Sequence, residues 1–177
     1  MLPVEQFMRD HFRRTEAVSQ IVARFLSKAR CSPRRAALTT LLFGLRAGGG
    51  FYTGPAMIAA GVHGRRRLAR QMEAVMQLVD LANLYDKPIE PDTWEIVRRN
   101  AARLPEDISP GAMRHFFSLV GHPARLGDLL RLLHEVRLLE RFIPAFEHAR
   151  SLLQFNQYHK YTVDEHCFRA VDMATGF

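Results

Sequence analysis

The chain has 177 residues, of which 47% are hydrophobic and 24% are charged, and its formal net charge is +7. That composition is ordinary for a folded domain and excludes a disordered tail, and the length suits one compact domain, or one domain and a fragment of another. The two cysteines, Cys31 and Cys167, allow at most one bridge. No disulfide framework is therefore expected, and a reducing cytoplasm is the expected location.

No apolar stretch reaches the roughly 18 residues that span a bilayer, and the first ten residues mix charged with apolar side chains. We therefore expect no membrane partner. The charge is uneven, because residues 1–88 contain 14 basic and 6 acidic residues whereas residues 89–177 contain 11 and 12. A basic half is compatible with nucleic-acid binding, but 22 of the 25 basic residues are arginine, a bias that also reflects coding composition. Charge alone decides no function.

The first predicted element is a long helix over residues 3–29, and Pro3 suits its first turn. Its apolar residues recur at helical spacing and form one stripe: Val4, Phe7, Met8, Phe12, Val18, Ile21, Val22, Phe25 and Leu26. We expect this stripe to face the core.

Residues 31–64 combine several signals. Ser32 and Pro33 suit the start of a short helix that continues to Leu42, and glycines break any helix beyond it. Short strands are expected within residues 42–60, which predicts a small β-hairpin there. The triple glycine at 48–50 is interpreted as a turn, because a phosphate-binding loop would lead directly into a helix with Lys, Ser or Thr at fixed spacing.

A second long helix is predicted over residues 65–85. The dipole of a helix disfavours cations at its N-terminus unless an anion binds there, and this predicted start is strongly basic. The candidate anion patch consists of Arg65, Arg66, Arg67 and Arg70. The alternative is a solvated basic face, which is what a run of like charges usually forms.

Further helices are predicted in quick succession downstream. Ser109 and Pro110 open one that ends at Gly121. Two capping boxes, Asp92 to Glu95 and Thr162 to Glu165, are expected to start the helices that follow them. The chain therefore predicts a mainly α fold, a bundle-like helical domain with short connections.

Metal-ligand side chains gather in the C-terminal stretch, and they are His159, Asp164, Glu165, His166 and Cys167. There is no His-Glu-x-x-His and no Cys-x-x-Cys, so the spacing does not define a self-contained metal site. No Gly-x-Ser-x-Gly marks a nucleophile, and no Asp-x-Asp supplies the paired carboxylates of magnesium-dependent nucleotidyl transfer. No catalytic residue is assigned on these grounds.

The segment Tyr-His-Lys-Tyr-Thr-Val-Asp-Glu-His at 158–166 is similar to the Tyr-His-x-Tyr-Thr-Val-Asp-Glu-His signature of bacterial PII uridylyltransferase/uridylyl-removing enzymes. The motif residues that carry the resemblance are Tyr158, His159, Tyr161, Thr162, Asp164, Glu165 and His166. Residues 129–146 resemble the region that precedes the signature in that family. Residues 7–13 and 84–93 resemble parts of the family's helical linker.

The resemblance implies a four-part enzyme with a nucleotidyltransferase domain, a helical linker, an HD phosphohydrolase domain and two ACT regulatory domains. Such enzymes uridylylate the PII signal protein when glutamine is scarce and remove the modification when glutamine is plentiful, and they use a divalent metal, Mg²⁺ or Mn²⁺. His166 aligns with the first metal-binding His of HD domains, but the chain has no His-Asp dipeptide for the ligands that follow.

On this resemblance, residues 1–155 are expected to form the helical linker domain and residues 156–177 the truncated start of the HD domain. The expected product is a fragment without catalysis or a cofactor of its own. Its expected partners are the PII signal protein or the missing domains of the parent enzyme. The last helix is then expected to leave Phe168 and Val171 partly exposed, or to repack them onto the linker.

Two alternatives stay open. One is a stand-alone helical interaction module that binds PII protein or a separate catalytic chain. The other is a basic helical domain that binds nucleic acid through residues 65–70 and the arginines of the first helix.

Overall fold

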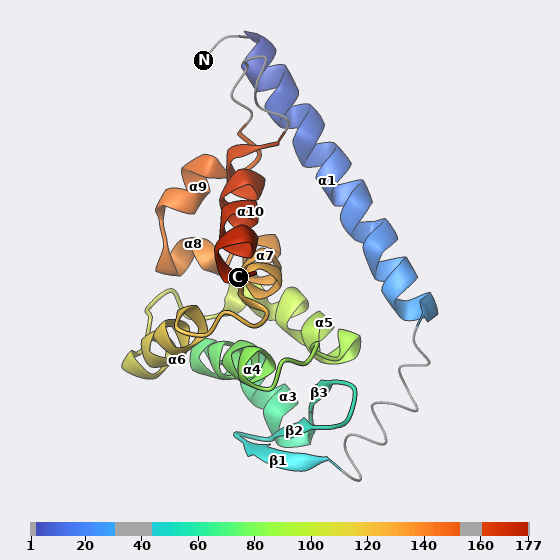
Figure 1. Ribbon diagram of the computed structural model, residues 1–177, viewed down its shortest axis with the longest axis vertical. Coiled ribbons are helices and arrows are strands. Elements are labelled where there is room, and N and C mark those ends of the chain that lie inside the picture. The colour runs from blue at the N-terminus through green and yellow to red at the C-terminus, as the bar shows by residue number, and fades with distance from the viewer. Residues whose placement is uncertain (1–2, 31–43, 153–160, 177) are drawn as a thin grey trace.

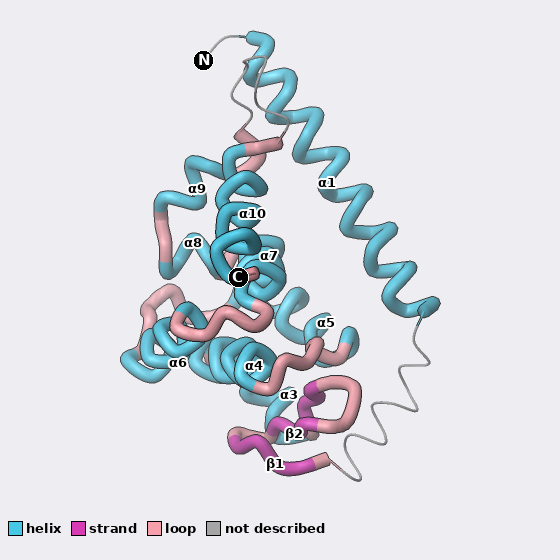
Figure 2. The backbone as a smooth tube through the Cα atoms, viewed as in Figure 1, coloured by secondary structure: helices cyan, strands magenta, loops and turns pink. Residues whose placement is uncertain are grey.

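The computed structural model describes residues 3–30, 44–152 and 161–176, and it confirms the mainly α fold with a small β element. The sheet lies at one end of the molecule, two groups of helices follow it, and the first helix runs along one side (Figures 1 and 2). Within the described ranges, no helix combines the length and the apolar character that crossing a membrane requires.

The sheet has three antiparallel strands in sequence order, β1 (Leu45–Gly48), β2 (Phe51–Thr53) and β3 (Ile58–Ala60). The hairpin that the sequence predicts is therefore present. Gly48, Gly49 and Gly50 all have positive φ, at 89°, 62° and 87°, which explains the triple glycine as a turn between β1 and β2. The predicted helix over residues 32–42 lies outside the described residues.

A short parallel bridge attaches the sheet to the helices. Ile58 pairs with Ile89, and the Glu90 amide donates to the Ile58 carbonyl at 2.8 Å. The Ala60 amide donates to the Thr93 hydroxyl at 3.0 Å, and that hydroxyl donates to the buried Glu90 carboxylate at 2.5 Å. These bonds satisfy polar groups that the fold buries next to β3.

The predicted helix over residues 65–85 is wrong in one respect, because the structure divides it into α3 (Val62–Leu68) and α4 (Met72–Leu84). Gln71 has extended backbone, with φ −127° and ψ 118°, and it starts the second helix. Leu68 and Met72 are both buried. Because the helix is broken here, α3 packs against α5 and α4 packs against α6.

Helix α5 (Pro91–Asn100) leads into a 3-10 turn, η1 (Ala101–Arg103). The capping box predicted at Asp92 and Glu95 is wrong. The helix begins two residues earlier than that box requires, with Glu90 as its N-cap and Pro91 at its first position. Glu95 instead pairs with Arg98 at 2.8 Å and with an exposed arginine of the same helix.

The central pair consists of α4 and α6 (Pro110–Val120), which run parallel. The Ser109 hydroxyl donates to Glu73 at 3.3 Å near their starts, and the Asn83 side chain donates to the Leu119 carbonyl at 3.0 Å near their ends. Ser109 caps α6 by accepting from the Ala112 amide at 3.1 Å, which confirms the predicted start.

The upper group of helices consists of α7 (Leu126–Glu135), α8 (Leu139–Phe142), α9 (Ala145–Ala149) and α10 (Val163–Thr175). Helix α10 packs on α7 and α9. Phe168 is buried, its ring 5.3 Å from both the His134 and the Phe146 rings, and Val171 is half-buried against the same core. Of the two expected outcomes for these side chains, the structure shows repacking onto the preceding helices.

Helix α1 (Pro3–Arg30) matches the predicted extent to within one residue, but the expectation that its stripe faces the core is wrong for most of the stripe residues whose side chains are described, with Met8 and Phe12 half-buried as exceptions. The helix stands apart from the helical body along most of its length (Figure 1). Phe7, Val18, Ile21 and Phe25 are between 61% and 73% exposed. The spacing predicted the stripe correctly, whereas what covers a stripe depends on tertiary contacts.

Candidate functional site

Part of the motif from the sequence lies in the described residues. Tyr158 and His159 lie outside them, whereas Tyr161 and Thr162 lead into α10 and residues 163–166 begin it. Thr162 is the N-cap residue of α10, as expected, but its side chain makes no capping bond to the helix. The predicted reciprocal box is therefore wrong, because Glu165 pairs with Arg131 of α7 instead.

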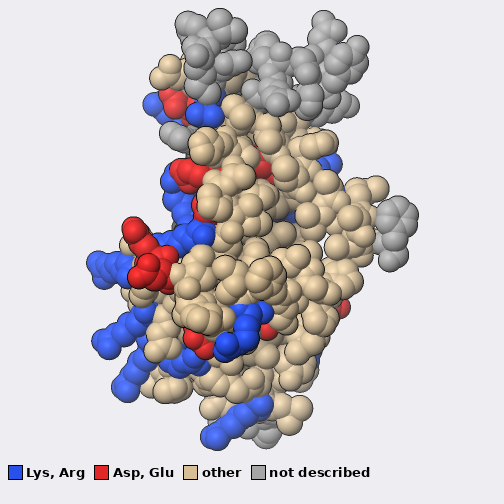
Figure 3. Space-filling model, turned by 90° about the vertical axis from the view of Figure 1, so that its left-hand side faces the viewer, with Lys and Arg blue, Asp and Glu red and all other residues tan. Residues whose placement is uncertain are grey.

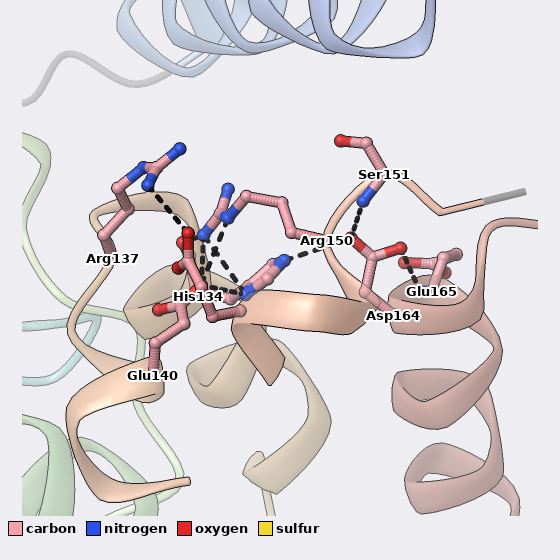
Figure 4. Close-up of polar contacts among 8 residues, drawn as sticks. His134, Arg137, Glu140, Arg150, Ser151, Asp164 and Glu165 are labelled. Atoms are coloured by element: carbon pink, nitrogen blue, oxygen red, sulfur yellow. Dashed lines mark hydrogen bonds and ion pairs between the residues drawn. The ribbon is translucent and has the colours of Figure 1, made fainter. Parts of the chain in front are cut away.

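A buried polar cluster holds the start of α10 against α7, α8 and the end of α9. We name it the His134 cluster, and it consists of His134, Glu140, Arg150 and Asp164 (Figure 4). All four side chains are at least nine-tenths buried. Two are cationic when protonated and two are anionic, so the cluster is neutral as a whole, which is the arrangement that makes burial of charge tolerable.

The imidazole of His134 bridges two carboxylates. Its Nδ1 lies 2.7 Å from Glu140 Oε1, and its Nε2 lies 3.1 Å from Asp164 Oδ2. The Arg150 guanidinium donates to the Glu140 carboxylate and to the His134 carbonyl. Since both ring nitrogens face carboxylate oxygens, the doubly protonated ring can donate to both.

Asp164 receives donors from several directions. The Ser151 amide donates to Oδ2 at 2.9 Å, and the Glu165 amide donates to Oδ1 at 2.9 Å. Burial alone would raise the pKa of this carboxyl, but the hydrogen bonds from His134, Thr162 and these amides outweigh burial and lower the pKa to about 2. Asp164 is therefore held as a carboxylate.

The pKa values of His134 and Glu140 also shift towards the charged form of each side chain. Burial would lower the pKa of His134, yet its bonds to Asp164 and Glu140 raise it above the ordinary value. Burial would raise the pKa of Glu140, yet its bonds to His134 and Arg150 lower it. The cluster thus favours the state in which all four side chains are charged. In this state their ion pairs join α7, α8, the end of α9 and α10.

A second clamp joins α7 to α10 at the rim of the cluster. Arg131 pairs with Glu165 at 3.1 Å and with Asp172 at 2.7 Å, and its guanidinium lies 5.5 Å from the centre of the Phe168 ring. Burial would lower the pKa of Arg131, but its bonds to Asp172 and Glu165 raise it. This clamp is partly solvent-exposed and adds less to stability than the buried cluster.

A cavity of about 470 Å³ lies beside the cluster. Its walls come from α1, α7, the turn after α9 and the first turns of α10, and they include Phe12, Thr15, Ser19, His134, Asp164 and Phe168. The motif residues Thr162, Asp164 and Glu165 all line it. The structure thus brings three motif residues to one place, whereas His166 is exposed on α10.

The candidate metal ligands from the sequence do not form a metal centre within the described ranges. No three His, Cys, Asp or Glu side chains there converge on a point that would hold an ion. His166 alone cannot hold a metal that takes four or more ligands. The residues that the structure describes therefore do not fit the divalent metal that the resemblance implies, and we derive no step through such an ion.

The candidate anion patch has a different setting from the one expected. Arg65, Arg66 and Arg67 lie in the last turn of the seven-residue helix α3, where the dipole favours cations without any anion. The Arg65 Nε donates to the Ala60 carbonyl at 2.9 Å, and Arg67 donates to the Gly49 carbonyl at 2.9 Å. Arg66 and Arg70 are exposed. Two of the four arginines therefore serve the fold.

The sequence reasoning missed the residues that complete the site. His134, Glu140 and Arg150 come from three different elements, and no local spacing connects them. One signal was present, since His134 follows Leu130 by four residues and so lies on the buried face of α7. A histidine on a leucine face needs buried partners, and the structure supplies them.

No family model matches the chain, and no solved structure matches it. The chain is 29% identical, over 198 aligned residues, to the bifunctional uridylyltransferase/uridylyl-removing enzyme of Caulobacter vibrioides, and the same figures hold for that enzyme from a second strain. The alignment covers 98% of this chain and 20% of the enzyme, so the chain spans about a fifth of the length of the curated relatives it matches. This similarity supports the uridylyltransferase resemblance along nearly the whole chain.

Proposed function

We propose that this chain acts as the helical linker of a PII uridylyltransferase/uridylyl-removing-type protein, together with the opening helix of an HD phosphohydrolase domain. Its role is to position and to bind rather than to catalyse. The similarity to the Caulobacter enzyme over 98% of the chain and the nine-residue motif support this proposal.

The observation that carries the proposal is a connection between the two segments that resemble the family most strongly, residues 129–146 and residues 158–166. His134 in the first segment meets Asp164 in the second, and Arg131 meets Glu165. A buried bond and an exposed clamp thus fix the first turns of α10 on the helical body. In a protein of the proposed type, this connection would set the direction in which α10 and His166 enter the next domain.

The absence of a complete active site from the sequence motifs supports a non-catalytic role. The chain has no Asp-x-Asp for nucleotidyl transfer and no His-Asp dipeptide for phosphohydrolysis. Its proposed partners are therefore the PII signal protein or the transferase and HD domains of such an enzyme. Binding to one of them is what the proposal requires.

Binding is tested with the purified full chain. Calorimetric titrations use unmodified PII protein, uridylylated PII protein and the separately expressed transferase and HD domains of the Caulobacter enzyme. We expect saturable binding to at least one of them. Binding to none of the four would overturn the proposal.

Two variants test the positioning role. Arg131→Gln breaks the exposed clamp without entering the buried cluster, and Asp164→Asn removes the charge that meets His134. We expect each variant to weaken the binding at least tenfold, because α10 is no longer held in one direction. Arg66→Ala, on the exposed side of α3, serves as the control and should leave the affinity within about twofold. Unchanged binding in both α10 variants would overturn the positioning role.

A further inference from the structure

A basic recess lies where α3 ends and α4 begins. Its volume is about 530 Å³, a size at which small organic molecules bind. Five of its six lining side chains carry nitrogen donors, and the lining consists of His63, Arg66, Arg67, Ala69, Arg70 and Gln71. Among the described residues, the lining contains no carboxylate. We name this hollow the α3 recess.

Arg67 is the fixed cation of the α3 recess. Its guanidinium donates to the Gly49 carbonyl at 2.9 Å and to the side-chain oxygens of Gln71 and Gln77, at 3.0 Å each. All three acceptors are neutral, so these bonds hold the half-buried guanidinium in place without cancelling its charge. Because Gln71 accepts through Oε1, its amide nitrogen is left as a further donor. The recess therefore contains preorganised donors and a positive charge without a counter-ion in the described chain.

Arg66 and Arg70 add two further cations. Both side chains are exposed, and within the described ranges neither guanidinium forms an ion pair or a hydrogen bond. Their neighbour Arg65 differs, because its guanidinium lies 3.7 Å from the Glu90 carboxylate. Three guanidinium groups without a carboxylate partner thus line one hollow. Since like charges at short range repel, a bound anion would relieve this repulsion and would be attracted by all three groups.

The surroundings of the recess strengthen its attraction for anions. In Figure 3, basic side chains project from the lower half of the molecule, which is the half that contains the sheet and α3 in Figure 1, and acidic side chains are less prominent there. Because exposed charges of one sign add to a common potential, this half of the molecule attracts anions, and the recess offers them a place to bind.

We propose that the α3 recess binds a chain of phosphate groups, supplied either by a free oligophosphate or by the triphosphate of a nucleotide. A planar guanidinium donates two N–H groups side by side to phosphate oxygens, which favours arginine at phosphate sites. Three such groups suit a ligand with several negative charges, and the volume of the recess suits a small molecule better than a single ion. The proposal is independent of the proposed function, because α3 and α10 lie in different parts of the molecule (Figure 1).

The lining favours a small ligand over a nucleic acid. Proteins that bind single strands stack the bases on aromatic side chains, and His63 supplies the one ring of the described lining. A duplex is bound by cations distributed along its backbone, whereas the recess gathers its cations within residues 63–70. The donors of the recess are therefore placed for phosphate groups and not for bases.

Isothermal titration of the full chain with sodium tripolyphosphate, in a buffer without divalent cations, tests the proposal. We expect saturable binding that is at least tenfold tighter than that of inorganic phosphate. Arg66→Gln and Arg70→Gln each remove one charged donor and should each weaken the binding about tenfold. Arg137→Gln removes the same charge from an exposed position between α7 and α8, and it should leave the affinity within about twofold. Far-UV circular dichroism confirms that each variant is folded.

Titration with ATP distinguishes the two sources of the phosphate chain. ATP that binds as tightly as tripolyphosphate would support the proposal with nucleotides among the ligands. ATP that binds at least tenfold more weakly would support it with free oligophosphate as the ligand.

Three results would overturn the proposal. The first is no saturable binding of tripolyphosphate. The second is an equal loss of affinity in Arg66→Gln, Arg70→Gln and Arg137→Gln, because binding would then follow net charge alone. The third is tighter binding of a short single-stranded oligonucleotide or of hexaglutamate than of tripolyphosphate, weakened by Arg66→Gln, which would assign the recess to nucleic acid or to an acidic protein segment.

Discussion

His134 and Asp164 are thirty residues apart in the sequence, yet His134 Nε2 and Asp164 Oδ2 lie 3.1 Å apart in the buried interior. This pair joins α7 to the first turn of α10 and belongs to a neutral cluster with Glu140 and Arg150. The start of α10, which carries the most specific sequence motif, is thus tied to the helical body by charge.

Removing one charge from the buried pair should be costly. Asp164→Asn leaves the protonated His134 with one carboxylate instead of two, and we expect a loss of about 3 kcal/mol in the free energy of unfolding. Asp172→Asn removes a carboxylate that meets only the exposed clamp of Arg131, and we expect less than about 1 kcal/mol. Urea unfolding monitored by the single tryptophan, Trp94, gives both values. Equal losses in the free energy of unfolding would contradict the larger stabilisation that we expect from the buried Asp164.

The pH dependence follows from the raised pKa of His134 and the lowered pKa of Asp164. The folded state holds the His134 proton more tightly, so this contribution is complete below about pH 6.5 and is lost as pH rises through the folded-state pKa. The Asp164 contribution is complete above about pH 4 and is lost as pH falls towards 2. Stability from this pair should therefore be greatest between about pH 4 and 6.5. The measurement is the urea midpoint from pH 5 to 9, compared with His134→Gln. A fall with rising pH that persists unchanged in the variant would have another origin.

The contact between the hairpin turn and α3 should tolerate no side chain. A Cβ at Gly64 would lie 2.5 Å from the Gly50 carbonyl oxygen and 3.0 Å from its carbonyl carbon, and both of these Gly50 atoms belong to the backbone. We expect Gly64→Ala to cost about 1 to 3 kcal/mol through overpacking. Gly121→Ala is the control, because its Cβ would lie 3.4 Å from the nearest atoms and its φ is −73°. Thermal unfolding compares the two, and a Gly64→Ala protein as stable as the control would contradict the close approach.

Two neighbouring arginines of α3 should differ sharply. Arg67 donates to the Gly49 carbonyl at 2.9 Å and to Gln77 at 3.0 Å, whereas Arg66 is exposed. Arg67→Ala should therefore cost about 1 to 2 kcal/mol, and Arg66→Ala should stay within about 0.5 kcal/mol. Chemical denaturation of both variants measures these two losses in the free energy of unfolding. The reverse order would show that the basic segment acts through its exposed charge rather than through the turn.

Features with a local cause were predictable from the sequence. The glycine turn between β1 and β2 and the Ser109 cap of α6 are set by neighbouring residues, and both are present. The break between α3 and α4 was missed because Leu68 and Met72 keep the i, i+4 spacing of one continuous helix. The capping box predicted at Asp92 was wrong because Pro91 takes the first helical position and moves the cap to Glu90.

Features with a tertiary cause were not predictable in the same way. The spacing in α1 indicates an amphipathic helix, but it does not specify whether a core or a partner covers Phe25. The His134 cluster draws its four side chains from four places along the chain, so no motif of fixed spacing describes it. Asp164 was singled out as a candidate metal ligand and as a residue of the motif, whereas its partner His134 was visible only as a histidine on a leucine face.

We propose that this chain positions and binds but does not catalyse. The most direct measurement incubates the purified chain with uridylylated PII protein and Mn²⁺ or Mg²⁺, and with unmodified PII protein, UTP and Mg²⁺, and follows the mass of PII. We predict no release and no transfer of uridylyl groups above the buffer control, at chain concentrations where the Caulobacter enzyme completes both reactions. Turnover of either kind that increases with the chain concentration would contradict the account, and its loss in His166→Ala would locate the activity in α10.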